Sequence, residues 1–360
     1  MKYILAILII SLIVFIHELG HFIAAKCCKV KVLKFAVGMG PKLIGKQWGE
    51  TEYSIRVFPF GGFCAMEGEE TDAISKSEIG DAAHNEGDRS LKNKPIWQRF
   101  IIFFAGPFMN VALGFVLAVV LVLMNKAVPT SQISDFHTIS GSNSTVSALS
   151  HNSGLEVGDT IIKMNGMRIF TTSDISYQIN SNAGKPMDVV IDRNGEEMTL
   201  KNVTFGDPNT GENIDFRIKG ESKNPINVLS YAAKDTISTG RLIWISLVDL
   251  VSGKYNISEM SGPVGMVKEI GNAASDSENL WQAILTLMRL SMFITVNLGI
   301  ANLLPIPGLD GGRILFLLVE AIRRKPLKPE HEGIVNLIGV GMVLLLVVAV
   351  TFSDIVELIG

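Results

Sequence analysis

Four long apolar runs divide this chain, at roughly Tyr3–Ala25, Phe100–Met124, Leu285–Leu304 and Ile334–Phe352. Each is close to the ~20 helical residues that cross a bilayer core of ~30 Å. The first run follows Lys2 as a signal peptide would, but it is long and lacks a small-residue cleavage site, so we expect it to be retained. The pattern predicts four transmembrane helices, with both termini on the same side of the membrane.

Basic residues next to the predicted spans indicate their orientation, because Lys and Arg concentrate on the cytoplasmic side. They gather in the loop between the first and second spans and in the loop between the third and fourth. We therefore expect both loops to be cytoplasmic, and both termini and the region 125–280 to be extracytoplasmic. The basic residues are Lys26, Lys29, Lys31, Lys34, Lys92, Lys94 and Arg99 in the first loop, and Arg313, Arg323, Arg324, Lys325 and Lys328 in the second.

The first loop contains a short segment in which apolar and polar residues alternate, from Thr51 to Val57. This period of two, followed by Pro59, Gly61 and Gly62, is typical of a strand or hairpin. One interpretation is a plain surface hairpin. The other is a sheet edge at the membrane face whose residues, Tyr53 and Ile55 among them, pair with an extended substrate backbone. The stretch Glu67–Asp88 is acidic and polar, and we expect a mobile loop there.

The extracytoplasmic region predicts one compact α+β domain at about 133–220. Its elements are a strand at Thr160–Lys163, an Asn165-Gly166 turn, a helix at about Ser173–Ser181 and a hairpin turning at Asn194-Gly195. The mixed pattern from Asn224 to Val251 predicts a helix on the membrane surface or packed on the core. The expected domains are 1–132 (two spans and the hairpin loop), 133–220, a linker at 221–280, and 281–360 (two further spans).

Composition agrees with a membrane core joined to a water-exposed domain, because 48% of the 360 residues are hydrophobic and 19% are charged. The 32 basic and 35 acidic residues give a formal charge of -3, so no nucleic acid partner is expected. The cysteines Cys27, Cys28 and Cys64 do not form a paired C-x-x-C motif, and we expect free thiols.

Ionisable side chains interrupt the first apolar run at His17-Glu18-Leu19-Gly20-His21. Such groups are costly in hydrocarbon and indicate a functional site. On a helix the two histidines lie one turn apart on one face, where both can ligate a single Zn²⁺, and Glu18 lies beside the attacking water. The alternative is a pair of histidines that hydrogen-bond to neighbouring helices.

A third ligand is expected from the segment after the third span, Asn302-Leu303-Leu304-Pro305-Ile306-Pro307-Gly308-Leu309-Asp310-Gly311-Gly312. The first and third spans run in the same direction, and Glu18 lies about 15 residues, or ~22 Å, into the first. The end of the third span reaches a comparable depth, where its prolines interrupt the helix. Asp310 then completes a His₂Asp set with an open fourth position, as catalytic zinc requires. A turn residue at the cytoplasmic interface is the alternative.

Three segments together resemble the hallmark motifs of the bacterial site-2 protease family of intramembrane zinc metalloproteases. They are His17–His21, Gly106-Pro107-Phe108-Met109-Asn110 and Asn302–Gly312. The stretch Gly154–Gly166 resembles a PDZ domain, present once. The segment Ser261-Gly262-Pro263-Val264-Gly265 is similar to the family's connection between PDZ domain and third span. The implied fold is a polytopic α-helical membrane protein with four transmembrane helices, a membrane-associated β-hairpin and an inserted extracytoplasmic α+β PDZ domain.

The resemblance implies that His17, His21 and Asp310 bind zinc and that Glu18 acts as general base and acid. Asn302 would contact the substrate backbone or help to stabilise the oxyanion. The implied activity is a metalloendopeptidase of the bacterial plasma membrane that cleaves transmembrane helices of single-span proteins, such as anti-sigma factors or signal-peptide remnants, after an earlier cut by another protease. The lipid bilayer is its surroundings, and the oligomeric state stays open.

Two other classes of protein compete with this interpretation. A PDZ-bearing membrane adaptor would keep a structural metal site, but the intact Glu18 and a three-ligand set favour catalysis. A zinc transporter would need ionisable residues along several spans, and the second and fourth offer none. Asn110 in the second span is either a contact between helices or part of the site.

Overall fold

The computed structural model describes residues 2–69, 87–137, 148–182, 184–207, 211–253, 265, 268, 270, 279–325, 327 and 329–359. They form two compact units, one of residues 1–117 and 243–360 and the other of residues 118–242. Two predictions fall wholly or partly outside the described residues: the polar loop Glu67–Asp88, at 70–86, and the motif Ser261–Gly265, at 261–264.

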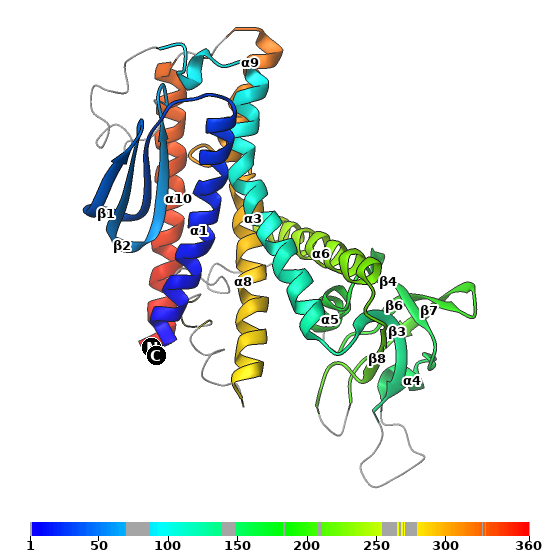
Figure 1. The fold of residues 1–360 in the computed structure, drawn as a ribbon. Coiled ribbons are helices and arrows are strands. Elements are labelled where there is room, and N and C mark those ends of the chain that lie inside the picture. Colours follow the sequence, from blue (N-terminus) through cyan, green and yellow to red (C-terminus); the bar gives the residue numbers. More distant parts are fainter. Residues whose placement is uncertain are drawn as a thin grey trace. The chain divides into compact units, whose positions relative to one another are not determined.

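The four predicted spans are confirmed as long apolar helices (Figure 1): α1 (Lys2–Cys27), α3 (Ile96–Met124), α8 (Leu280–Asn302) and α10 (Pro329–Ile359). Three of them begin four or five residues before the apolar run, in short segments that mix apolar and polar residues. In α8, for example, the Asn279 side chain accepts a hydrogen bond from the Gln282 amide at 2.9 Å. Their length and composition are those of membrane-spanning segments.

Small residues let these helices approach closely. A Cβ atom added to Gly20 of α1 would lie 2.4 Å from the Ala105 carbonyl oxygen of α3, and one on Gly114 of α3 would lie 2.3 Å from Val296 Cγ2 of α8. Glycines at such contacts allow van der Waals packing between helix backbones in lipid, where the hydrophobic effect does not drive association. The three helices therefore form one tightly packed group.

The loop between α1 and α3, predicted to be cytoplasmic, contains a sheet of two long, bent strands, β1 (Val32–Trp48) and β2 (Thr51–Met66). Gly38, Gly40 and Gly61 have φ between +83° and +86°, where the strands bend. The cross-strand partners place four runs side by side in the order 61–66, 32–37, 51–56 and 42–48. The predicted alternating strand is confirmed, but the sheet is larger than one hairpin.

The prediction that Tyr53 and Ile55 hold a substrate strand is wrong as regards backbone pairing. Tyr53 pairs with both Phe35 and Lys46, and Ile55 is likewise paired on both sides. Their run is therefore an inner one whose two edges are already occupied. The Tyr53 ring packs 6.2 Å from the ring of Phe35, as part of the contact between sheet and α1. The sequence pattern identified a strand but not its position in the sheet.

The sheet packs on α1 and on the start of α3 through a buried apolar cluster, formed by Ala24, Ala25, Val30, Val32, Phe35, Cys64, Met66, Leu91, Ile102, Phe103 and Leu317. At the turn between the strands, Glu50 accepts hydrogen bonds from Lys26 at 2.7 Å and from Arg89 at 2.6 Å. These hydrogen bonds to Arg89 and Lys26 hold the pKa of Glu50 at about 2. The sheet is thus fixed against the end of α1.

The second unit has a sheet of six strands with the order β7-β6-β4-β3-β8, and β5 pairs with β4. Its elements are β3 (Val128–Phe136), α4 (Leu149–Asn152), β4 (Thr160–Met164), β5 (Met167–Arg168), α5 (Thr172–Ser181), β6 (Met187–Arg193), β7 (Glu196–Val203) and β8 (Phe216–Glu221). Each predicted element of this region is present: the strand, both Asn-Gly turns with positive φ, and the helix.

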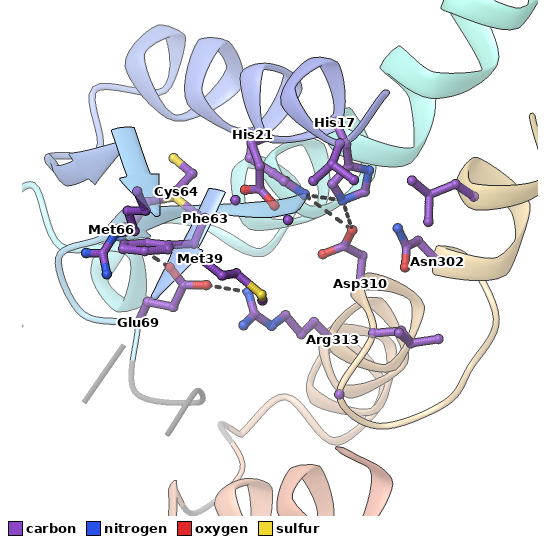
Figure 2. A pocket seen from close by; sticks show the side chains of 18 of the residues that line it. His17, His21, Met39, Phe63, Cys64, Met66, Glu69, Asn302, Asp310 and Arg313 are labelled. Atoms are coloured by element: carbon purple, nitrogen blue, oxygen red, sulfur yellow. Dashed lines mark hydrogen bonds and ion pairs between the residues drawn. The ribbon is translucent and has the colours of Figure 1, made fainter. Parts of the chain in front are cut away.

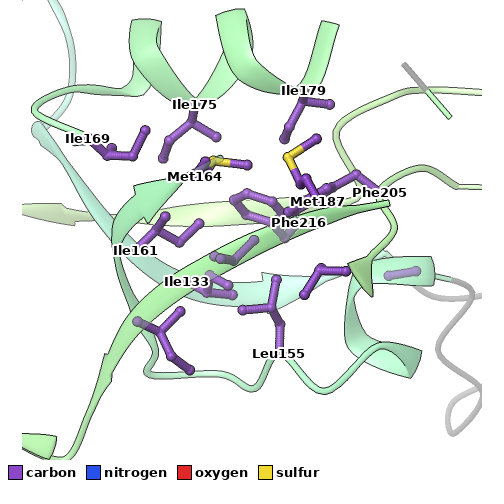
Figure 3. Packing of buried hydrophobic residues seen from close by; sticks show 14 of the residues in the cluster. Ile133, Leu155, Ile161, Met164, Ile169, Ile175, Ile179, Met187, Phe205 and Phe216 are labelled. Carbon is purple, nitrogen blue, oxygen red and sulfur yellow. The ribbon is translucent and has the colours of Figure 1, made fainter. Parts of the chain in front are cut away.

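The core of the second unit lies between α5 and the sheet (Figure 3). Ile161 and Met164 of β4 meet Ile175 and Ile179 of α5, and all four are at most 2% exposed. The Asp174 carboxylate accepts hydrogen bonds from the amides of Phe170 and Thr171 at 2.7 and 3.2 Å. These two amides directly precede α5 and have no partner within the helix. This unit has its own hydrophobic core.

The mixed pattern 224–251 forms a single helix, α6 (Pro225–Val251). Within the second unit, Asp235 accepts a hydrogen bond from Ser173 at 3.1 Å, and Ser238 donates one to Asp174. Ile226 and Ile237 are exposed, at 79% and 62%. The first part of α6 therefore packs on α5 with polar groups and leaves apolar residues uncovered, as in an amphipathic helix next to lipid.

Candidate metal centre

The helical spacing of α1 places His17 and His21 on one face, as predicted. Their Nε2 atoms lie 3.2 Å apart, and the rings meet edge to face with centroids 4.8 Å apart. The residues are 7% and 6% exposed. Both nitrogens therefore point at a common position inside the helix group.

Asp310 lies at the first position of α9 (Asp310–Arg323) and reaches the same position. Its Oδ2 is 3.1 Å from His17 Nε2 and 3.3 Å from His21 Nε2 (Figure 2). In a tetrahedral zinc site with bonds of about 2.0–2.1 Å, two ligand atoms lie about 3.3 Å apart. The three atoms thus have the spacing of three corners of such a tetrahedron, and this donor set fits Zn²⁺.

Backbone contacts fix the segment that carries Asp310. The chain leaves α8 at Asn302, passes two prolines and turns at Gly308, where φ is +92°. Asn336 of α10 is 2% exposed, and its Oδ1 accepts a hydrogen bond from the Gly308 amide at 3.2 Å. A Cβ on Gly311 would lie 2.2 Å from the Leu304 carbonyl oxygen. The backbone is therefore so closely packed that Asp310 has little freedom to move.

Neighbouring groups on α3 orient both imidazoles. His21 Nδ1 lies 2.8 Å from the Ile102 carbonyl oxygen, and Asn110 lies 3.3 Å from His17 Nδ1. A Cβ on Gly106 would approach His21 Nε2 to 2.2 Å, so only glycine leaves room for this ring. Pro107 has no amide hydrogen, so one helical hydrogen bond is missing in the middle of α3. The motif Gly106–Asn110 thus shapes the surroundings of the two histidines.

A cavity of about 590 Å³ opens beside the three groups. Glu18 and Asn302 line it, as do residues 61–64 of β2. Figure 2 shows Asn302 beside Asp310, on the other side of the cavity from Phe63 and Cys64. A Cβ on Gly62 would lie 3.3 Å from Glu18 Cγ, so the strand passes directly alongside the carboxylate. The structure therefore brings together Glu18, Asn302 and the three predicted ligands, and it places neither Tyr53 nor Ile55 at the cavity.

Several groups at the cavity were not expected from the sequence. Arg313 forms an ion pair with Glu69 and lies over the Phe103 ring, with its guanidinium carbon 5.2 Å from the ring centroid. Its position three residues after Asp310 on the same helix face is a signal that could have indicated it. Cys64 also lines the cavity, where burial raises the pKa of its thiol. Cys64 does not belong to the group of described side chains whose ligand atoms converge at His17, His21 and Asp310.

Among the described residues, His17, His21 and Asp310 form the cluster whose ligand atoms all lie within 4.8 Å of one another. The cavity supplies space for a peptide backbone and for water. A carboxylate, Glu18, stands next to the cluster without belonging to it. This combination of three ligands, an open side and an independent carboxylate can perform metal-assisted hydrolysis.

Comparison with known proteins identifies the class. Residues 5–346 match the sequence profile of peptidase family M50. The chain is 34% identical to a candidate zinc metalloprotease of Clostridium acetobutylicum, over 98% of this chain and 97% of the relative. It is 30% identical to zinc metalloprotease RasP of Bacillus licheniformis, over 98% of both chains, and 29% identical to the regulator of sigma-W protease RasP of Bacillus subtilis, over 98% of this chain and 97% of the relative. The chain belongs to peptidase family M50, and it is a zinc metalloendopeptidase of a bacterial membrane.

Proposed function

We propose that His17, His21 and Asp310 hold the zinc ion and that Glu18 is the general base and acid of peptide hydrolysis. The observation that carries this assignment is the triangle of ligand atoms with sides of 3.1, 3.2 and 3.3 Å. A zinc ion bound there would act as a Lewis acid on the scissile carbonyl and make water a better nucleophile. Glu18 accepts the proton of the attacking water and passes it to the leaving amine.

Metal analysis of the purified protein tests the ligand set directly. We expect one zinc per chain for the wild type and less than about a tenth of that for His17→Ala and for Asp310→Ala, because the remaining two ligands do not hold zinc tightly. Cys64→Ala is the matched control at the same cavity, and its zinc content should equal that of the wild type. Retention of zinc by both ligand variants would refute this ligand set.

The substrates that fit are transmembrane segments of single-span membrane proteins. The centre lies among helices of membrane-spanning length, which favours substrates that themselves lie in the membrane. The name regulator of sigma-W protease, carried by a relative, supports anti-sigma factors as one class, and signal-peptide remnants are a second. Since substrate segments end close to the membrane only after their external domains are removed, we place the enzyme after an earlier protease.

A helical substrate hides its amides in its own hydrogen bonds and must unwind before hydrolysis. We propose that the run 61–66 of β2 receives the unwound strand. It lines the cavity, and among the described residues it pairs with no run other than 32–37. The Met66 amide already donates to Glu69 Oε2 at 3.2 Å, so the edge available to a substrate lies before Met66. Main-chain bonds to this edge would replace those lost by the substrate. Asn302, on the opposite side of the cavity, would hold the substrate backbone or help to stabilise the oxyanion.

Proline substitutions test the edge. Neighbouring amides of a strand point to opposite sides, so one of Phe63 and Cys64 directs its N–H into the cavity. Proline at that residue should reduce cleavage of a single-span substrate by at least about tenfold without changing the melting temperature, because it removes a donor from the open edge. Ile44→Pro, on the opposite edge of the same sheet, is the control. Equal cleavage by the variant with proline at that residue and by Ile44→Pro would refute strand addition.

Residues 133–220, within the second unit, are proposed to form a single extracytoplasmic PDZ domain, and the domain boundaries 1–132, 133–220, 221–280 and 281–360 are proposed with it. The resemblance of Gly154–Gly166 supports this proposal, and the strand, helix and hairpin that the sequence pattern predicts around it are present. The basic residues beside the spans support a cytoplasmic position for the centre and an extracytoplasmic position for both termini. Such a domain could bind a new C-terminus or exclude substrates with bulky external domains.

If the PDZ domain excludes bulky substrates, the cleavage rate depends on whether the external domain of the substrate has been removed. A substrate with an intact folded external domain should be cleaved at least about tenfold more slowly than the trimmed substrate by the wild type, because the folded domain would collide with the PDZ domain before reaching the centre. The measurement is cleavage of both substrates in proteoliposomes. Equal rates would exclude the filter and leave recognition of a C-terminus as the role of the domain.

A further inference from the structure

Asn110 lies in the middle of α3 and has no exposed surface. Its Nδ2 is 3.3 Å from His17 Nδ1, while its Oδ1 has no hydrogen-bond partner among the described residues. A buried polar atom without a partner is costly, and most such atoms in proteins are satisfied. An orphaned oxygen next to a proposed metal ligand therefore suggests that the amide has a partner in another state of the site.

The chemistry of the imidazole identifies that partner. Nε2 of His17 faces Asp310, so the ligand lone pair must lie on Nε2 and the proton of the neutral ring on Nδ1. In His21, the Nδ1–H group already has an acceptor. Its Nδ1 lies 2.8 Å from the Ile102 carbonyl oxygen, which can only accept, so Nδ1 is the donor there. His17 needs an acceptor at the corresponding place, and Asn110 is the group within reach.

We propose that Asn110 is the positioning residue of His17, and that in the zinc-bound protein Oδ1 of Asn110 accepts the hydrogen bond from Nδ1–H. Rotation of the amide by 180° about its terminal side-chain bond exchanges Oδ1 and Nδ2 with little change in volume. The exchange gives Oδ1 a partner, moves Nδ2 to the position that Oδ1 now occupies, and fixes both the tautomer and the orientation of the His17 ring. The inference rests on the proposed role of His17 as a zinc ligand.

A role in helix packing alone does not explain this side chain. The contact of Asn110 with α8 is made by its backbone, since Thr295 Oγ1 donates to the Asn110 carbonyl oxygen at 3.1 Å. That bond is available to any residue at position 110. The surroundings are also tight, because a Cβ on Gly299 would lie 3.3 Å from Asn110 Cβ. Test variants at this position should therefore keep the Cγ-branched shape of asparagine or be smaller.

The test is the zinc dissociation constant of the full-length protein in detergent, measured by competition with a chelator. Asn110→Asp keeps an acceptor of the same size, and its constant should stay within about threefold of the wild type, because a carboxylate is a common partner of a ligating histidine. Asn110→Leu and Asn110→Ala remove the acceptor and should weaken zinc binding by about 10–100-fold. The Co²⁺-substituted protein gives a second readout, since the visible spectrum reports ligand geometry. It should change in the Leu and Ala variants but not in the Asp variant.

Control variants separate the positioning role of Asn110 from its contact with α8 and from the proposed zinc site. Thr295→Val removes the bond between helices and should lower the melting temperature while leaving the zinc constant unchanged. Wild-type zinc affinity in Asn110→Ala, or equal loss in Asn110→Asp and Asn110→Leu, would overturn the positioning role. His17→Ala distinguishes a failure of the proposed zinc site from a failure of the positioning role. If it leaves zinc binding intact, the proposed centre is wrong and the role of Asn110 falls with it. If it abolishes binding while Asn110→Leu and Asn110→Ala do not weaken it, only the positioning role is wrong.

Discussion

Glu18→Gln should abolish cleavage of a tagged single-span substrate while the protein keeps its zinc. The substitution preserves the size of a side chain that lines the cavity, and it removes the group that accepts and returns the proton. General acid–base catalysis contributes about 10²–10⁴-fold to a rate, so we expect a loss of at least about a thousandfold. Because Glu18 stands outside the His₂Asp triangle, the zinc dissociation constant should change by less than about threefold.

The experiment requires metal analysis and the cleavage assay on the same preparations. His17→Ala is the matched partner, since it lies on the same helix and should lose zinc and activity together. Glu18→Gln with zinc but without activity, beside His17→Ala with neither, would separate the base from the ligands. Full activity of Glu18→Gln would sink the assignment of the base, and it would also favour a different carboxylate, with Glu69 at the same cavity the first to examine.

The parts of the fold that follow from hydropathy were predictable from the sequence. A segment in lipid must satisfy its backbone internally, so a long apolar run has no alternative to a helix. The histidine pair followed from the helical period, and Asp310 from the break at Pro305 and Pro307. In the water-exposed unit the Asn-Gly turns indicated the hairpins, because few other pairs adopt positive φ readily.

Sheet order and long-range contacts did not follow from the sequence. The alternation at 51–57 indicates a strand, but whether a strand is inner or outer depends on which distant runs pair with it. The sequence therefore predicts an open strand edge at Tyr53. Among the described residues, the open edge beside the cavity belongs to the run that contains Gly62. Asn336 supports Gly308 from a helix 28 residues later in the chain. Nothing local to Asn336 distinguishes it from a polar residue that merely contacts a neighbouring helix.

Gly311→Ala should disable the centre although it adds a single methyl group next to Asp310. The new Cβ would lie 2.2 Å from the Leu304 carbonyl oxygen and 2.4 Å from the Leu303 carbonyl carbon, both of which are backbone atoms that cannot rotate away. The first turn of α9 must then shift and take Asp310 with it. A displacement of about 1 Å at a reacting centre can cost about 10²-fold in rate. We expect at least that loss of cleavage, and zinc binding weakened by more than about tenfold.

Gly341→Ala in α10 is the matched control, because its added Cβ meets no atom within 4 Å. Alanine is the better helix former by about 0.8–1.0 kcal/mol, so this variant should keep full zinc binding and activity with an equal or higher melting temperature. The two variants carry the same chemical change and differ only in what surrounds it. Wild-type zinc affinity and cleavage in Gly311→Ala would show that the segment can relax around the methyl group. The close packing after Pro307 would then not be what holds Asp310 on the two histidines.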